Sequence, residues 1–163
     1  MTDRLELRPL RPDDADEMVV VLADEALYTV IGGHPPNLDE LRGRYTRQAV
    51  GRSKDGTETW HNWILRRRDD GAAIGFVQVT AVDRVAELAW LVGVAWQGRG
   101  YATEAVSAVV DRLAADGVTT IQAHIAPGHR PSEIVAERVG LGVTNQVDDG
   151  ERVWRLDLRS PWR

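Results

Sequence analysis

The segment that most constrains the fold of this chain runs over residues 87–115, ELAWLVGVAWQGRGYATEAVSAVVDRLAA. Its first part, residues 88–94, is almost wholly apolar and predicts a buried strand. From Ala102 to Leu113 the apolar residues recur at helical spacing, and Gly117 follows as a helix stop. The chain therefore passes from a buried strand into an amphipathic helix within a few residues.

The connection between this strand and helix is QGRGYA, residues 97–102. Its glycines allow close backbone approach and positive φ where the first N–H groups of the helix have no intrahelical partner. Together with the positive end of the helix dipole, such a corner can bind a phosphate or pyrophosphate. Neither GxxxxGK[ST] nor a full GxGxxG is present, so a P-loop or Rossmann site is not favoured. From these residues alone, a simple tight turn is the alternative.

Length and composition favour one soluble globular domain over residues 1–163, long enough to bury a core. The net charge of −5 disfavours nucleic acid as a partner. The absence of cysteine excludes disulfides and thiol nucleophiles, and the four scattered histidines lack metal-ligand spacing, so we expect no metal. With no apolar signal region and no run long enough to span a membrane, we expect a cytoplasmic protein without a membrane partner.

The rest of the chain predicts a mixed α/β sheet flanked by helices. Asp70-Gly71 and Asp149-Gly150 are typical of hairpin turns. Loops are expected at residues 28–37 and 51–59, and the glycines and prolines of the first can shape a turn. We expect strands at residues 5–10, 60–68, 72–80, 86–94, 119–125, 142–147 and 152–158, and helices that begin at Pro12, Leu38, Ala102 and Glu133.

Three segments carry a resemblance to a known family. WQGRGYATEA contains the pattern Q/R-x-x-G-x-G/A and resembles the acyl-CoA pyrophosphate loop of the GNAT superfamily of N-acetyltransferases, in particular its RimJ/RimL-like branch. LELRPLRPDDADEM resembles the start of such chains, and IAPGHRPSEIVAERVGL resembles a later family segment. The resemblance spans residues 4–158 and implies the GNAT fold, an α/β (α+β) domain with a mixed, mostly antiparallel central sheet.

The resemblance also implies acetyl-CoA as co-substrate and the residues that bind it. Backbone groups of Val92 and Val94 would hold the pantetheine arm and the thioester carbonyl. His129 stands where the family has an asparagine that contacts pantetheine, and a histidine can also donate a hydrogen bond. The pyrophosphate would be bound by Gln97, Gly98, Arg99, Gly100, Tyr101, Ala102 and Thr103.

Two residues match catalytic positions of relatives. Glu87 would be the base that deprotonates the amine, and Ser132 the acid that protonates the thiolate. The residues themselves leave alternatives open: Glu87 as a solvent-facing strand-end carboxylate, Ser132 as the N-cap of a helix over 133–139, and His129 as the proton donor. Glu104 is expected to complement the helix dipole.

The acceptor implied by the resemblance is a primary amine, either a protein N-terminus or a small molecule. The resemblance also implies that the loop at residues 28–37 lines the acceptor side, and the alternative is that this loop only shapes a turn. A non-catalytic acyl-CoA-binding or sensing domain is the alternative, because the last helix lacks the tyrosine that many relatives use as general acid. The sequence leaves open whether the protein forms a homodimer. Trp90 and Trp154 are expected in the core, and Trp60 and Trp63 either in the core or around the acceptor.

Overall fold

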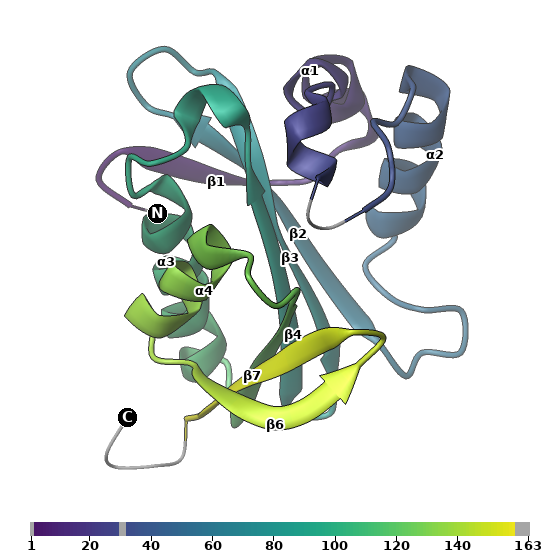
Figure 1. The fold of residues 1–163 in the computed structure, drawn as a ribbon. Helices are drawn as coiled ribbons and strands as arrows, with labels where there is room; N and C mark the ends of the chain where they lie inside the picture. Colours follow the sequence, from purple (N-terminus) through teal and green to yellow (C-terminus); the bar gives the residue numbers. More distant parts are fainter. Residues whose placement is uncertain (1, 30–31, 159–163) are drawn as a thin grey trace.

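The structure, a computed structural model, describes residues 2–29 and 32–158 and has a mixed sheet between two pairs of helices (Figure 1). The seven strands follow the order β1-β2-β3-β4-β5-β7-β6, and only the β4–β5 pair is parallel. The predicted fold class is confirmed. Parts of two predictions lie outside the described residues: positions 30–31 of the loop at 28–37, and residues 1 and 159–163 of the domain.

The strands are β1 (Leu5–Pro9), β2 (Thr59–Arg67), β3 (Ala73–Val82), β4 (Val85–Val92), β5 (Thr120–Ile125), β6 (Gly142–Asp148) and β7 (Glu151–Asp157). The α-helices are α1 (Ala15–Val21), α2 (Leu38–Gln48), α3 (Tyr101–Ala115) and α4 (Arg130–Arg138). Short 3₁₀ turns are η1 (Pro12–Asp14), η2 (Glu25–Tyr28) and η3 (Val94–Trp96).

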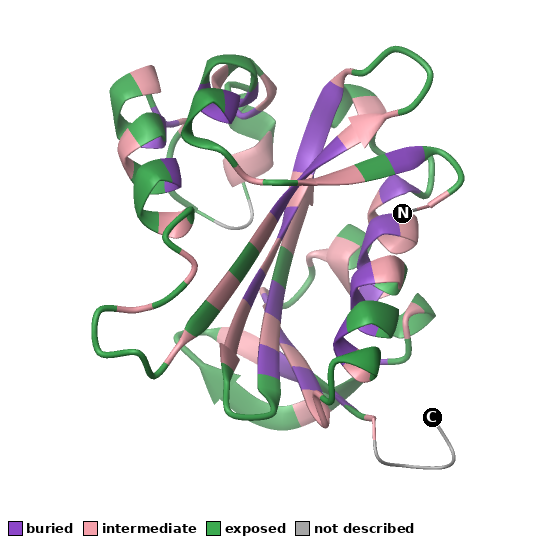
Figure 2. Cartoon of the chain, turned by 180° about the vertical axis from the view of Figure 1, so that it is seen from behind, coloured by how far each residue is buried: buried purple, intermediate pink, exposed green. Residues whose placement is uncertain are grey.

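The sheet separates two hydrophobic clusters. Helices α3 and α4 lie against one face, and α1 and α2 lie against the other (Figure 1). Neighbouring residues of one strand serve both clusters, since successive side chains point to opposite faces: Leu65 belongs to the larger cluster with α3, and Ile64 to the smaller cluster with α1 and α2. In Figure 2 the buried residues of α3 follow the side turned toward the sheet.

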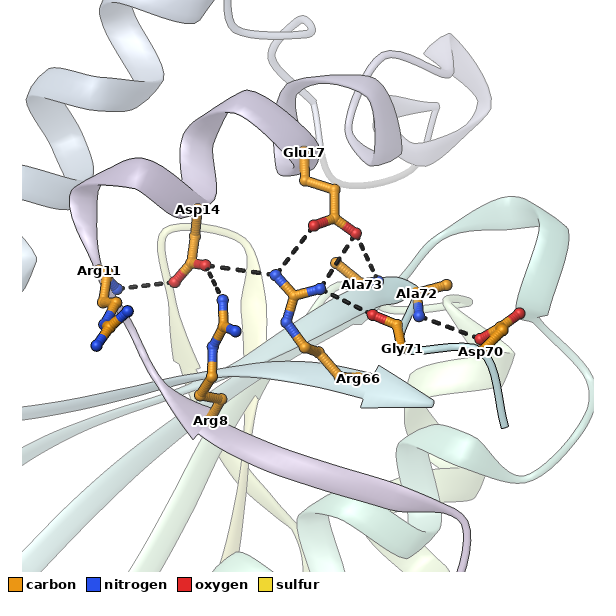
Figure 3. A network of polar contacts seen from close by, with 9 residues as sticks. All are labelled: Arg8, Arg11, Asp14, Glu17, Arg66, Asp70, Gly71, Ala72 and Ala73. Atoms are coloured by element: carbon orange, nitrogen blue, oxygen red, sulfur yellow. Dashed lines mark hydrogen bonds and ion pairs between the residues drawn. The ribbon is translucent and has the colours of Figure 1, made fainter. Parts of the chain in front are cut away.

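Charged side chains fasten α1 to the sheet (Figure 3). The Asp14 carboxylate is 3% exposed and lies 2.5 Å from Arg8 and 3.5 Å from Arg66. Glu17 accepts hydrogen bonds from Arg66 and from the Ala73 N–H, and the Arg66 bond lowers the pKa of Glu17 against a smaller opposing effect of burial. A buried carboxylate needs such partners, so this network fixes where α1 sits on β1 and β2.

The end of β4 depends on Gly75 in the neighbouring strand β3. A Cβ atom at Gly75 would lie 2.1 Å from the carbonyl oxygen of Leu91, closer than any real contact. The Gly93 N–H donates to the Ile74 carbonyl at 2.7 Å, and the chain then enters the 3₁₀ turn η3. Strand β4 therefore ends at Val92, two residues before the predicted end at Val94.

The parallel pair β4–β5 is short, and its two strands part. The pairing covers Val85↔Thr120, Ala86↔Ile121 and Glu87↔Gln122. Beyond Glu87, β4 stays paired with β3 up to Val92, whereas β5 stays paired with β7 up to Ile125. An opening therefore forms in the middle of the sheet, beside the start of α3.

We predict that Gly75→Ala destabilises the fold by at least about 2 kcal/mol, because the new methyl group must displace the backbone of β4. Urea denaturation would measure the loss. Gly43→Ala is the matched control: its Cβ would meet only the flexible end of Arg47, at 3.5 Å, and alanine is favoured inside a helix by about 0.5–1 kcal/mol. Equal unfolding midpoints for Gly75→Ala and the unaltered protein would contradict the prediction.

Candidate active site

A cavity of about 1220 Å³ fills the opening between β4 and β5. One end is bounded by the glycine turn and the start of α3, and the start of α4 lies beside it. The other end lies over the sheet face that carries α1 and α2, where Ala26 and Leu27 of η2 contribute. The floor there is formed by alternate residues of β3 and β4: Phe76, Gln78, Thr80, Glu87, Ala89 and Leu91.

The structure brings most of the predicted site residues to this one cavity. Val94 and Arg99 do not line it: Val94 begins η3, and Arg99 is exposed in the glycine turn. The predicted residues that line it are Glu87, Val92, Gln97, Gly98, Gly100, Tyr101, Ala102, Thr103, His129 and Ser132.

The glycine turn has the backbone that an anion site requires. Gly98 and Gly100 adopt φ values of 76° and 81°, in the left-handed region that favours glycine. The Glu104 N–H donates to the Gly100 carbonyl at 3.0 Å, so the amides of residues 101–103 precede the first hydrogen bond of α3. The Gln97 side chain donates to the Val92 carbonyl at 2.9 Å, which ties the turn to the end of β4.

An arginine before β1 holds the outside of this turn. Arg4 donates to the Arg99 carbonyl at 2.9 Å, and its guanidinium lies 4.4 Å from the centre of the Tyr101 ring. It also pairs with Glu104 at 2.7 Å, and the Thr2 hydroxyl donates to the same carboxylate. Burial acts to raise the pKa of Glu104, but the bonds from Thr2 and Arg4 outweigh it and lower that pKa. Glu104 thus anchors the N-terminal segment as well as lying in the first turn of α3.

Glu87 is not a free strand-end carboxylate. It faces the cavity, and its Oε1 atom contacts Nδ1 of His124 on β5. The other ring nitrogen of His124, Nε2, lies 3.1 Å from Oδ2 of Asp148 at the end of β6. Burial acts to lower the pKa of His124, but the hydrogen bond with Asp148 and the charge of Glu87 outweigh it, so that pKa is raised. His124 and Asp148 were not among the predicted site residues.

The start of α4 differs from the prediction. The helix begins at Arg130, three residues before the expected start at Glu133, with His129 as its N-cap residue. Ser132 therefore lies inside the first turn and is not the N-cap. Pro131 allows this because proline, which lacks an N–H and has a fixed φ, is compatible with the first turn of a helix. Both His129 and Ser132 face the cavity.

The tryptophans divide between core and cavity. Trp63 and Trp154 are buried in the larger hydrophobic cluster. Trp90 is half-buried, packs against that cluster and lines the cavity. Trp60 is half-buried, and its indole N–H donates to Glu58 at 3.0 Å.

The family model of the acetyltransferase (GNAT) domain matches residues 4–142. The chain therefore belongs to the GNAT acetyltransferase family, as its resemblance predicted. No curated protein matches the sequence significantly. Among the described residues, no helix is long and apolar enough to cross a membrane, and no group of three or more His, Cys, Asp or Glu side chains could hold a metal ion.

Solved structures share the fold over nearly the whole chain. An acetyltransferase from Agrobacterium tumefaciens str. C58 has a TM-score of 0.75 at 26% identity, over 96% of this chain and 92% of that one. A chimera of spermidine N-acetyltransferase SpeG from Vibrio cholerae and hSSAT has a TM-score of 0.77 at 18% identity, over 96% and 97%. Microcin C7 self-immunity acetyltransferase MccE, solved with acetyl-CoA and AMP, has a TM-score of 0.78 at 13% identity, over 95% and 93%.

We predict that Arg4→Ala loosens the glycine turn, because the turn loses a hydrogen bond at Arg99 and the cation–π contact at Tyr101. These contacts are worth about 1 kcal/mol, so hydrogen exchange of the hydrogen-bonded amides at the two ends of the turn, Gln97 and Glu104, should accelerate about fivefold. Arg68→Ala is the control, since Arg68 binds the Thr2 carbonyl but does not reach the turn. The same acceleration in both variants would show that any loosening of the N-terminal segment has this effect.

Proposed function

We propose that this protein is an acetyl-CoA-dependent N-acetyltransferase that moves an acetyl group directly to a primary amine. The observation that carries the proposal is one cavity that connects the glycine turn with the carboxylate of Glu87, through an opening in the sheet. Family membership supports the same chemistry.

The residues around the opening suit the parts of acetyl-CoA. The amides of Tyr101, Ala102 and Thr103, at the positive end of a 15-residue helix, would bind the pyrophosphate. Backbone groups at the end of β4, near Val92, would hold the pantetheine arm, because β4 has no parallel partner there. His129 would add a hydrogen bond from the start of α4. The volume of about 1220 Å³ leaves room for an acceptor as well.

The transfer needs three proton movements. The acceptor ammonium gives a proton to Glu87, and the neutral nitrogen then attacks the acetyl carbon. A C–N bond forms as the C–S bond breaks, and the thiolate of coenzyme A takes a proton from the hydroxyl of Ser132. The surplus proton on the acetylated nitrogen then restores the Ser132 hydroxyl and leaves a neutral amide. Both residues line the same cavity, Glu87 on β4 and Ser132 in the first turn of α4.

The acceptor would enter from the face that carries α1 and α2. On that face the floor of the cavity combines the polar side chains of Gln78 and Thr80 with the apolar Phe76 and Leu91, and Glu87 lies at the edge of the floor. The RimJ/RimL-like sequence resemblance favours a protein N-terminus, whereas the spermidine enzyme of the same fold supports a small amine. Both are primary amines at the point of attack, and the experiment below separates them.

Calorimetric titration with acetyl-CoA, followed by thiol release with a panel of N-terminal peptides, polyamines and aminoglycosides, tests the proposal. We expect micromolar binding and thiol release with one class of amine. Binding without release for any amine would favour an acyl-CoA-binding or sensing domain, and no binding would contradict the assignment of the glycine turn.

We predict that Gly100→Ala weakens acetyl-CoA binding at least tenfold, because a side chain at this positive φ shifts the backbone that presents the first amides of α3. Gly117→Ala, at the other end of the same helix, is the matched control: its φ is 91° and nothing lies within 4 Å of a Cβ there. Both variants should lose about 1–2 kcal/mol of stability. Equal affinities by calorimetry would indicate that the turn is only a tight connection.

Glu87→Gln should lower kcat on the order of 100-fold while the Kd for acetyl-CoA stays within about twofold, because only deprotonation of the amine is lost. Glu151→Gln is the control, as Glu151 also lines the cavity. Its kcat should stay within about threefold of the unaltered enzyme. Unchanged transfer by Glu87→Gln, with an unchanged pH profile, would remove Glu87 from the mechanism.

A further inference from the structure

His124 contacts the proposed base Glu87, Asp148 contacts His124, and the proposed transfer leaves both unused. The register of the strands explains how His124 comes to lie beside Glu87, and Asp148 beside His124. Glu87 stands opposite Gln122, so His124, two residues further along β5, is its diagonal neighbour on the same face of the sheet. Asp148 reaches His124 from β6, across β7.

Both nitrogens of the His124 ring are engaged by carboxylates, Nδ1 by Glu87 and Nε2 by Asp148. The ring therefore has no nitrogen left to take a proton from an acceptor amine directly. Glu87, with a side chain 42% exposed at the cavity, can receive that proton. Asp148, with a side chain 49% exposed, lies at the outer end of the chain of contacts.

We propose that His124, held by Asp148, relays the proton that Glu87 takes from the acceptor amine to solvent. The inference rests on the proposed function. His124 and Asp148 are positioning residues, because they act through Glu87 and do not touch the amine.

The proton balance is complete without any further reactant. The ammonium gives one proton to Glu87, and Glu87 passes it to neutral His124, so that Glu87 is again a carboxylate. The resulting imidazolium lies between two carboxylates and then loses one proton to solvent beside Asp148. The competent state of the enzyme therefore has a neutral His124, ready to accept.

The neighbouring strands β6 and β7 carry other charged side chains, and none of those described below is a direct partner of the His124 ring. Arg155 on β7 faces Gln122 and donates to the Gln146 side chain, whose amide in turn donates to Asp148 at 3.1 Å. Arg152 donates to the Thr144 carbonyl at 3.1 Å, and Glu151 stands opposite Asp148 in the ladder. The direct partners of the ring are Glu87 and Asp148.

The sign of the pH dependence follows from this arrangement. Asp148 stabilises the imidazolium, so it delays formation of the neutral, competent ring as the pH rises. The acidic limb of kcat/KM should then lie above about pH 6.5, the ordinary range of an imidazole, and far above pH 4, where carboxylates ordinarily titrate. Removing the charge of Asp148 should move that limb to lower pH.

The experiment measures pH profiles of kcat/KM for the enzyme and its variants, with the amine that the panel identifies. We expect Asp148→Asn to shift the acidic limb down by about half a pH unit or more. Asp149→Asn is the matched control: it removes the same charge from the adjacent turn residue, whose φ of 50° asparagine tolerates well. The acidic limb of the kcat/KM profile of Asp149→Asn should stay at the pH of the unaltered enzyme. His124→Gln should lower kcat at least tenfold and abolish the imidazole limb, with the Kd for acetyl-CoA and the Tm nearly unchanged.

NMR titration of the His124 ring in the same variants separates the possible failures. A titration midpoint that moves in Asp148→Asn while the kinetic limb stays fixed would overturn the relay and leave the proposed function intact. A midpoint that does not move would overturn it too, since Asp148 would not control the ring. Absence of acetyl transfer to every amine would contradict the proposed function, and the relay with it.

Discussion

The parting of β4 from β5 is the constraint on which the site depends. Two parallel strands normally pair along their common length, but here the pairing stops at Glu87 and Gln122 because each strand then follows a different neighbour. Strand β4 is held against β3, where Gly75 permits the close approach of Leu91, and β5 is held by β7. The opening that results lets the two faces of one sheet share a cavity, and the proposed transfer uses it by bringing donor and acceptor together from opposite sides.

The segments that build the site are anchored by contacts between distant parts of the chain. The glycine turn is braced from outside by Arg4, and Glu104 in the first turn of α3 ties both to the N-terminal segment. On the opposite face, Asp14 and its arginine partners place α1 on the sheet. In each case a carboxylate with several donors fixes an element that apolar packing alone would leave free to slide.

Local sequence patterns predicted the mixed sheet and the glycine turn, because a strand, a turn and an amphipathic helix are encoded by neighbouring residues. The family resemblance added Glu87, Val92, His129 and Ser132, which line the cavity. Contacts that depend on strand register could not be predicted from these local patterns. The meeting of Glu87 with His124 requires the β4–β5 alignment, and Asp148 joins only through the β6–β7 hairpin. The error at α4 had a different origin: the helix was expected to begin at Glu133, after Pro131, although the first turn of a helix accepts proline.

The two hydrophobic clusters have a consequence for protein engineering. The smaller cluster is formed by α1, α2 and the sheet residues Ile64 and Ala73, whereas α3, α4 and the glycine turn belong with the larger one. Residues 12–48 form one continuous segment, which also carries Ala26 and Leu27 into the cavity. Exchanging that segment for a homologue's, with Asp14 and Glu17 retained as the partners of Arg8 and Arg66, would change this wall of the cavity and leave α3, α4 and the glycine turn as they are.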